Sequence, residues 1–450
     1  MEICTIGGFD EVGRNMTAIK VGNDVFIFDA GIYLPAVIEM QENETQPQQA
    51  YTEKKLRDIG AIPDDLVLDK LGWTNKVRAI IVSHAHLDHV GAIPYIADRY
   101  PQAEIFATPF TMAVLNSILR DEKIKLKNNK KIIKSNSFQI VKGKSQNYKI
   151  EFIHTTHSTI QCAFVALHSN EGIFFYALDF KFDNYPTLGE PPNYKRLKEL
   201  GKKGIKVLIV DSLYSNIEKK LGGEKIAKQL LDEAFYSVNS KNSALFVTTF
   251  SSHIERLNNI VNLGKKKNRE IIFVGRSLNK YVDCAISVKS CPFKGEIGMA
   301  KYKGKVNSIL KKVEKNRGKY LIVCTGHQAE SASILDRIIK NETPFKFRPG
   351  DNIIFSSSVI PVSANIIARE RMDKKLRKIG VKIQTDIHVH GHGSRDGLRD
   401  LLEILKPKHV IPAHGPIKIT SPMIELSSEF GYKFGETAHL SSNGKVIKIK

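Results

Sequence analysis

The chain has 450 residues, of which 42% are hydrophobic, and its formal net charge is +21 at pH 7. This length favours two domains over a single core, and no apolar run reaches the roughly 18 residues of a membrane span. The positive charge favours a polyanionic partner, either nucleic acid or an anionic membrane surface, although a general enrichment in lysine would produce the same excess. Five cysteines without CxxC spacing argue against a cysteine-based zinc site. The cysteines favour a reducing compartment. The N-terminal residues are acidic and glycine-rich, unlike a secretory signal, which agrees with a cytoplasmic protein.

The first part of the chain reads as strands separated by turns. Residues 1–31 alternate between apolar and polar positions with glycine punctuation, which predicts short strands and tight turns. The polar residues 39–55 predict a surface loop. Residues 77–83 (VRAIIVS) predict a buried strand, and further strands are predicted at 148–158, 172–180 and 206–212, each ending in a polar residue that could take part in chemistry.

Residues 121–150 contain nine lysines against only Asp121 and Glu122. A solvated surface is the simpler interpretation of this segment, and an RNA-facing patch is the alternative.

After residue 214 the pattern changes to strands that are each followed by a helix. Four such units begin near residues 243, 269, 319 and 351. Continuous apolar strands that alternate with helices predict a parallel sheet covered on both faces. The strand ends read TTFSSH, GRS, TGHQ and SSS. These groups suit phosphate oxygens. For any one strand end, ordinary helix capping by Ser and Thr is the preferred explanation, whereas the four ends together favour a phosphate-lined edge.

The C-terminal part returns to the first pattern. Residues 398, 401, 402 and 405 are leucines with the spacing of an amphipathic helix, and Ser394 is a suitable N-cap. The segment KHVIPAHG that follows predicts a short strand ending in a histidine.

Residues 83–89 (SHAHLDH) concentrate metal-binding side chains at the end of a predicted strand. His84 and His86 can point the same way and bind one ion, while Asp88 and His89 lie just beyond and can reach a second ion. Imidazole and carboxylate groups are the ligands that zinc accepts when no thiolate is offered. The remaining ligands must come from other strand ends, where the candidates are His157, Asp179 and His414, each of which alone would more often be structural. His168 is a poorer candidate, because ALHSNEG predicts a loop at its position.

Together these residues resemble the metallo-β-lactamase fold, and the strand–helix block resembles the β-CASP insertion of its nucleic-acid-processing members. Several motifs are similar to those of the ribonuclease J family, in particular its compact archaeal members. These motifs are GGFDEVGRNM, THS, DFKFD and TFSSHIER, and HVHGH followed by a helix and PAHG. The resemblance implies an αββα sandwich at residues 1–213 and 388–450, interrupted by a parallel α/β domain at residues 214–387.

The resemblance also implies roles for individual residues. His84, His86 and His157 would bind one zinc ion, Asp88, His89 and His414 would bind a second, and Asp179 would bridge the two. His392 would be the general acid, oriented by Asp211. The residues that would hold RNA phosphates are Ser251, Ser252, His253, His388, Val389, His390, Gly391 and His392.

The function implied is a zinc-dependent ribonuclease, a 5′-to-3′ exoribonuclease acting on single-stranded RNA with a 5′ monophosphate. An RNA endonuclease and a small-molecule hydrolase of the same fold are the alternatives, and a homodimer is one expected assembly.

Two motifs depart from the family pattern. TGHQAE carries Ala329 where glycine is expected, and residues 356–365 read SSSVIPVSAN instead of ending in IPGNE.

Overall fold

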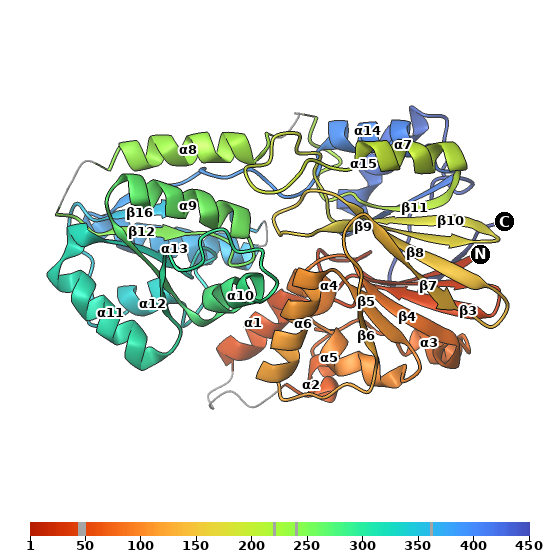
Figure 1. The fold of residues 1–450 in the computed structure, drawn as a ribbon, viewed down its shortest axis with the longest axis horizontal. Coiled ribbons are helices and arrows are strands. Elements are labelled where there is room, and N and C mark those ends of the chain that lie inside the picture. Colours follow the sequence, from red (N-terminus) through yellow and green to blue (C-terminus); the bar gives the residue numbers. More distant parts are fainter. Residues whose placement is uncertain (44–50, 219–221, 239–241, 361–362) are drawn as a thin grey trace. The chain divides into compact units, whose positions relative to one another are not determined.

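The structure is a computed structural model that describes residues 1–43, 51–218, 222–238, 242–360 and 363–450 (Figure 1). The chain divides into two compact units. Unit 1 comprises Met1–Asn184, Glu190–Leu221 and Gly391–Lys450, and unit 2 comprises Tyr185–Gly189 and Gly222–His390. The domain boundaries expected after residues 213 and 387 remain a prediction.

Unit 1 contains two sheets that pack face to face. The first has the strand order β19-β1-β2-β3-β4-β5-β6 and the second the order β18-β11-β10-β9-β8-β7. The strands of the first sheet are β1 (Glu2–Gly7), β2 (Met16–Val21), β3 (Asp24–Phe28), β4 (Val77–Val82), β5 (Glu104–Ala107), β6 (Lys130–Ile132) and β19 (Lys445–Lys448). Those of the second are β7 (Ser137–Lys142), β8 (Asn147–His154), β9 (Ala163–Ser169), β10 (Gly172–Ala177), β11 (Ile205–Asp211) and β18 (His409–Ala413).

Alternating apolar side chains form the core between these sheets. Phe28 of β3 lies 4.8 Å from Phe174 and 5.1 Å from Tyr176 of β10, measured between ring centroids. Because side chains of a strand point alternately to its two faces, every second residue of β3 and β10 enters this core.

Helices cover the outer faces of both sheets of unit 1. On the second sheet lie α7 (Tyr194–Lys203), α14 (Arg395–Leu405) and α15 (Ile417–Ser428). The predicted leucine stripe is confirmed, since all four leucines of α14 are buried against that sheet. The first sheet is accompanied by α1 (Leu34–Asn43), α2 (Glu53–Asp58), α3 (Val67–Lys70), α4 (Leu87–Val90), α5 (Ile93–Ile96) and α6 (Pro109–Asp121). The predicted αββα sandwich is therefore confirmed.

Unit 2 is built on one parallel sheet with the order β14-β13-β15-β12-β16-β17. The four predicted strand–helix units are confirmed as β12 (Leu245–Thr248) with α9 (Ile254–Lys266), β13 (Glu270–Val274) with α10 (Arg276–Ser287), β15 (Tyr320–Cys324) with α12 (Ile334–Ile339), and β16 (Asn352–Phe355) with α13 (Ser363–Ile379). The structure adds helices α8 (Glu224–Tyr236) and α11 (Lys303–Lys315) and edge strands β14 (Gly298–Ala300) and β17 (Lys382–Gln384).

Two local predictions were wrong. The predicted loop 39–55 begins inside α1 and ends inside α2, while residues 44–50 lie outside the described residues. Thr52 starts α2 because its side chain accepts a hydrogen bond from the Lys55 backbone N–H at 3.2 Å. His168, expected in a loop, lies in β9 with Nε2 2.8 Å from Glu151. Among the described helices, none has both the length and the apolar character that a membrane span requires.

Candidate metal centre

Ends of several strands in unit 1 bring histidines and carboxylates to one place. His84 and His86 follow β4, and the next turn is α4, which carries Asp88 and His89. His157, Asp179 and His414 follow β8, β10 and β18 respectively. The structure thus gathers all seven residues that the sequence predicted as metal ligands, and they form two groups whose ligand atoms lie within 4.8 Å of one another.

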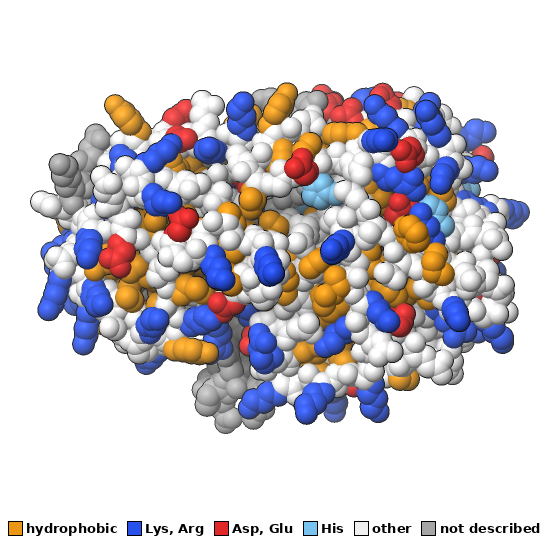
Figure 2. All heavy atoms as spheres, in the orientation of Figure 1, with side chains coloured by type: hydrophobic (Ala, Val, Ile, Leu, Met, Phe, Trp, Pro, Cys, Tyr) orange, Lys and Arg blue, Asp and Glu red, His pale blue; other side chains and the backbone are white. Residues whose placement is uncertain are grey.

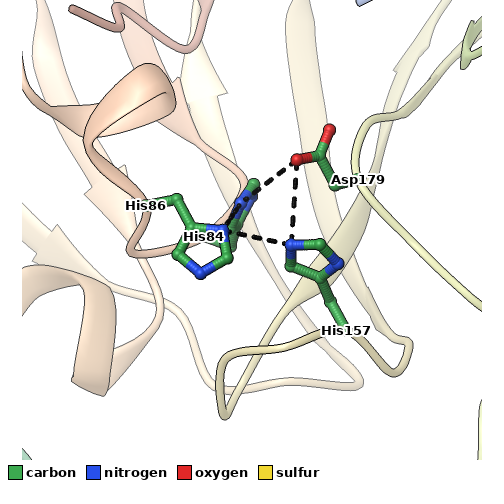
Figure 3. Close-up of side chains that lie close together, drawn as sticks. All are labelled: His84, His86, His157 and Asp179. Atoms are coloured by element: carbon green, nitrogen blue, oxygen red, sulfur yellow. Dashed lines mark hydrogen bonds and ion pairs between the residues drawn. The ribbon is translucent and has the colours of Figure 1, made fainter. Parts of the chain in front are cut away.

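The first group consists of His84, His86, His157 and Asp179 (Figure 3). Nδ1 of His86 lies 3.1 Å from Nε2 of His84 and 3.1 Å from Nε2 of His157. Oδ2 of Asp179 lies 3.7 Å from each of the latter two nitrogens. Three ring nitrogens and one carboxylate oxygen therefore converge on a single point.

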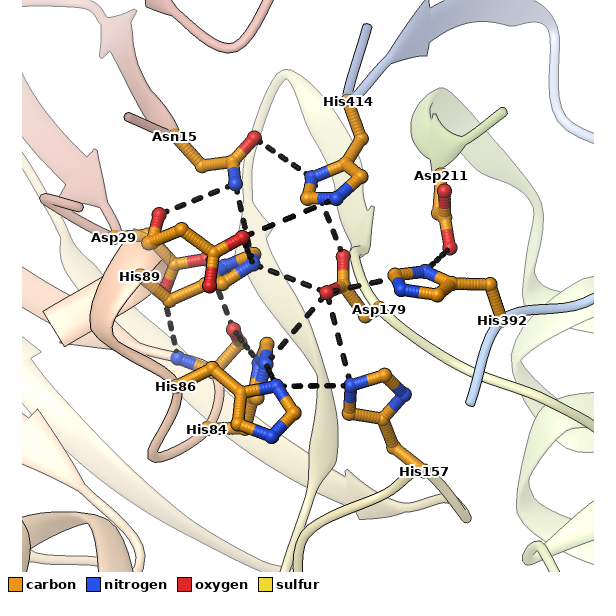
Figure 4. Close-up of polar contacts among 12 residues, drawn as sticks. Asn15, Asp29, His84, His86, His89, His157, Asp179, Asp211, His392 and His414 are labelled. Carbon is orange, nitrogen blue, oxygen red and sulfur yellow. Dashed lines mark hydrogen bonds and ion pairs between the residues drawn. The ribbon is translucent and has the colours of Figure 1, made fainter. Parts of the chain in front are cut away.

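The second group consists of Asp88, His89, Asp179 and His414 (Figure 4). Nε2 of His89 lies 3.5 Å from Oδ2 of Asp88 and 3.2 Å from Oδ2 of Asp179. Nδ1 of His414 lies 3.6 Å from Oδ1 of Asp179. The two oxygens of Asp179 thus face both groups, as the bridging assignment expects.

His392 adjoins these groups from another side of Asp179 (Figure 4). Its Nδ1 lies 2.7 Å from Oδ2 of Asp211 and 3.9 Å from Oδ2 of Asp179. Asp211 ends β11 and is buried, so the carboxylate has a fixed position from which to orient the imidazole. The predicted pairing of these two residues is present in the geometry.

Hydrogen bonds to neighbouring oxygen atoms fix the orientation of two of the histidine rings. Nδ1 of His89 lies 2.7 Å from Oδ2 of Asp29, and Nδ1 of His157 lies 2.6 Å from the carbonyl oxygen of Gly391. A Cβ at Gly391 would lie 2.8 Å from the His157 ring, so this close approach requires glycine. With Nδ1 donating to these oxygens, Nε2 of each ring is left as the ligand atom.

Asp29 and Asn15 were not singled out by the sequence interpretation. Asp29 follows β3 with a φ of 57°, and it accepts hydrogen bonds from the backbone N–H and hydroxyl of Ser83. Asn15 joins the second group, with its amide 3.2 Å from Nε2 of His89 and 3.1 Å from Nδ1 of His414. The signal for Asp29 was the carboxylate that ends the apolar run DVFIFD, the same position that drew attention to Asp179 and Asp211.

Burial and charge set the protonation of these side chains. Burial lowers the pKa of His86 to about 4 and lowers the pKa values of His84 and His157 well below the ordinary range, which keeps all three in the neutral form that binds metal. Burial opposes ionisation of Asp179, but the facing His414 and His89 outweigh it and hold its pKa well below the usual range. The pKa of His392 is raised to about 9, because the carboxylates of Asp211 and Asp179 outweigh the opposing effect of burial.

The donor set fits divalent metal. Among the described residues, Oδ1 of Asp179 is a buried carboxylate oxygen that accepts no hydrogen bond. Leaving such an oxygen unpaired is costly unless a cation is near. Imidazole nitrogens and carboxylate oxygens around it supply the ligands that such a cation needs.

Replacing Asp29 by asparagine is expected to weaken metal binding by about 10- to 100-fold, because His89 loses the carboxylate that orients its ring. Competition with a chromogenic chelator measures this affinity. Asp24→Asn is the matched control, since Asp24 is an equally buried carboxylate at the start of β3 and bonds Arg78 and the Lys144 backbone N–H. An Asp29→Asn affinity equal to that of Asp24→Asn would contradict the orienting role.

Most of the predicted RNA-binding residues lie in unit 2. Ser251, Ser252 and His253 follow β12, where Nε2 of His253 is 3.4 Å from Glu224. Arg256, fully buried, donates to both oxygens of Glu224 and approaches Nδ1 of His388 at 3.4 Å.

This network brings the segments near residues 253 and 388 together within unit 2. The His388 and His390 rings lie 5.4 Å apart. Val389 is buried, and Gly391 and His392 belong to unit 1.

The departures from the family motifs have local structural consequences. Ala329 adopts a φ of 59°, the left-handed region that favours glycine, which costs about 1 kcal/mol for a residue with a Cβ. In the second motif, residues 361–362 lie outside the described residues. Gln328 donates to the carbonyl oxygen of Ser358 at 2.8 Å and accepts from the Ile360 N–H at 2.9 Å, which joins the two motifs.

Comparisons with known families agree with this geometry. Residues 9–159 match the model of the metallo-beta-lactamase superfamily, and residues 242–372 match that of the ribonuclease J beta-CASP domain. Residues 378–434 match the Zn-dependent metallo-hydrolase RNA specificity domain. A structure from Enterococcus faecalis titled as a protein of unknown function matches with a TM-score of 0.64 at 14% identity over 99% of both chains, which shows the likeness of fold alone.

Three relatives named Ribonuclease J or Ribonuclease J 1 match this chain over at least 99% of its length. The chain is 39% identical to Ribonuclease J of Pyrococcus abyssi, over 100% of this chain and 97% of the relative. It is 35% identical to Ribonuclease J of Methanocaldococcus jannaschii, over 100% and 99%. It is 28% identical to Ribonuclease J 1 of Streptococcus pyogenes, over 99% of this chain and 74% of the relative. By this end-to-end similarity, with the metallo-beta-lactamase and beta-CASP matches in their expected order, the chain belongs to the ribonuclease J family.

Proposed function

We propose that this chain is a metal-dependent ribonuclease that holds two zinc ions and degrades single-stranded RNA from a 5′ monophosphate in the 5′-to-3′ direction. The observation that carries the proposal is the position of Asp179, which belongs to both His/Asp groups and to a third group with Asp211 and His392. Two donor sets that share one carboxylate, with an acid beside them, form an arrangement suited to two-metal hydrolysis of phosphodiester bonds.

Zinc is the proposed metal because the donors are mainly imidazole nitrogens, whereas magnesium and calcium prefer sets of oxygen ligands. His84, His86, His157 and Asp179 would hold one ion, and Asp88, His89, His414 and Asp179 the other. Two metal ions in such a site lower the pKa of a water molecule towards ~7 and stabilise negative charge on phosphoryl oxygens.

His392 supplies the proton in this mechanism. Burial lowers the pKa of its ring, but the carboxylate of Asp211, which lies 2.7 Å from Nδ1, raises this pKa and favours the protonated form. Nε2–H then gives its proton to the leaving 3′ oxygen as the bond between that oxygen and phosphorus breaks. Asp211 is a positioning residue, because it contacts His392 and acts through it.

The RNA substrate is supported by the name of the relatives, the RNA specificity domain match and the net charge of +21. We propose the 5′-to-3′ direction from the resemblance to the ribonuclease J family. The five free cysteines, four of them buried, suit a reducing compartment, and we propose the cytoplasm. The homodimer stays a prediction.

Digestion of end-labelled RNA tests this function. A 5′-monophosphate RNA labelled at its 3′ end is expected to lose length progressively from the 5′ end, and the same RNA with a 5′ triphosphate is expected to be degraded more slowly. Labelled mononucleotide should appear early when the label is at the 5′ end. Internal fragments of equal yield from both RNAs would support an endonuclease instead, and absence of any cleavage with zinc supplied would refute the ribonuclease assignment.

A further inference from the structure

One surface segment of unit 1 is purely basic. Residues 123–150 contain nine lysines and neither aspartate nor glutamate. They form β6 and β7, the last strands of the first and second sheets respectively, and the start of β8. We name this segment the lysine edge. On the face of the molecule drawn in Figure 2, lysine and arginine side chains outnumber aspartate and glutamate side chains.

Apolar side chains are exposed within the lysine edge. Ile132, Phe138 and Ile140 are 54%, 52% and 53% exposed, respectively. Phe138 pairs with Glu151 and Ile140 pairs with Lys149 across β7 and β8, so these four side chains share one face of the second sheet. The other face of β7 places Val141 in the core between the sheets.

Lys149 also contacts the exposed aromatic ring. Its Nζ lies 4.3 Å from the centroid of the Phe138 ring, and it lies 3.2 Å from Oε2 of Glu151. Lys149 therefore lies over one face of the ring, while about half of the Phe138 surface remains accessible.

Lysines on an edge strand have an ordinary explanation, because they prevent edge-to-edge pairing of sheets. That explanation does not extend to an exposed phenylalanine and two exposed isoleucines on the same two strands, which would favour association. A second copy of the chain would bring the same lysines together, and their repulsion opposes such a contact. Charge complementarity instead selects a polyanion.

We propose that the lysine edge binds single-stranded RNA outside the metal centre, with its lysines on phosphates and a base stacked on the Phe138 ring. Basic grooves with aromatic side chains are the common design of surfaces that bind single strands without sequence preference. The proposal rests on the proposed function, because it assumes that the substrate is RNA. It adds a second contact region for long substrates.

The position of β8 connects this surface to the metal centre. Glu151, opposite Phe138, is six residues before His157 along β8 and its continuation. At about 3.3 Å per residue the separation is at most roughly 20 Å. A long RNA strand can therefore contact the lysine edge and the metal centre together, whereas an oligonucleotide of two or three nucleotides in the metal centre is too short to bridge a separation of that size.

Charge reversal tests the proposal. The variant Lys134→Glu/Lys142→Glu/Lys144→Glu changes three exposed lysines of the edge, and Lys303→Glu/Lys305→Glu/Lys311→Glu changes three exposed lysines of α11 by the same total charge. Binding of a long, fluorescent single-stranded RNA is measured by anisotropy over a range of salt. The edge variant is expected to lose about 2 units of log–log salt slope, roughly 0.7 for each phosphate contact, and the α11 variant to lose less than one.

Phe138 provides a test that does not depend on charge. Phe138→Ala is expected to weaken binding of the long RNA by about tenfold, and Phe138→Tyr to retain it, because tyrosine keeps the stacking face. Cleavage of a short 5′-monophosphate oligonucleotide is expected to be unchanged in all four variants, which also shows that they are folded.

The results separate this proposal from the proposed function. If the unaltered chain cleaves neither RNA, the ribonuclease assignment fails, whatever the edge binds. If it cleaves both, but the edge and α11 variants bind long RNA equally, the lysine edge is not an RNA site. Phe138-dependent binding to phosphatidylserine vesicles, or to an acidic protein, without an effect on RNA would also overturn the proposal.

Discussion

Alanine in place of Asp179 is expected to lower the rate of RNA hydrolysis at least about 10³-fold, because both metal positions lose the carboxylate they share. The unaltered chain should carry about two zinc ions, and the variant fewer. Elemental analysis of the purified protein measures the metal, and single-turnover cleavage measures the rate. Oδ2 of Asp179 lies 3.7 Å from Nε2 of His84 in the first group and 3.2 Å from Nε2 of His89 in the second, which is the physical reason to expect a combined loss.

Asp65→Asn is the control for this prediction. Asp65 is also a fully buried carboxylate of unit 1, but it bonds Arg57 and Arg99. Its replacement is expected to reduce thermal stability while leaving metal content unchanged. Active protein without tightly held transition metal would refute the two-zinc assignment, and an Asp179→Ala variant that keeps both ions would show that this carboxylate is not a shared ligand.

Replacing His392 by alanine is expected to lower the rate by about 10²–10⁴-fold, the usual worth of a general acid, with metal content unchanged. Asp211→Asn is expected to act in the same direction, because the 2.7 Å contact to Nδ1 of His392 then orients the ring poorly. The two defects should not multiply in the double variant, since the residues act as one unit. A substrate with a sulfur leaving group at the 3′ position needs little protonation and should restore much of the rate.

The control for His392 is His439→Ala, which removes another histidine of unit 1, one whose Nε2 lies 3.1 Å from Nδ1 of His409. It is expected to leave the rate unchanged. If His392→Ala instead removes one metal ion, then His392 is a ligand. The two-metal hydrolase would stand, but the identity of the acid would have to be sought elsewhere.

Local sequence determined much of the site. SHAHLDH after an apolar run predicted four ligand positions, because a strand that ends in a turn exposes consecutive side chains at one sheet edge. The same rule pointed to His157, Asp179 and His414, since each follows an apolar run that is a strand in the structure. Hydrophobic periodicity also predicted the parallel sheet of unit 2 and the buried stripe of α14, because burial of one face imposes a period on nearby residues.

Only the tertiary structure decided which of these strand ends meet. Asp211 and His392 are 181 residues apart, and the segments that follow them are joined by the parallel bridge between Tyr214 and Ser394. The parallel pairing of β11 with β18 places Asp211 opposite Ala413 and hence next to His414. Strand order is set by packing between residues distant in sequence, so no local pattern encodes it. Asp29 and Asn15 belong to the site for the same reason. Asp29 lies there because β3 pairs with β4, and Asn15 because its turn contacts His89 and His414.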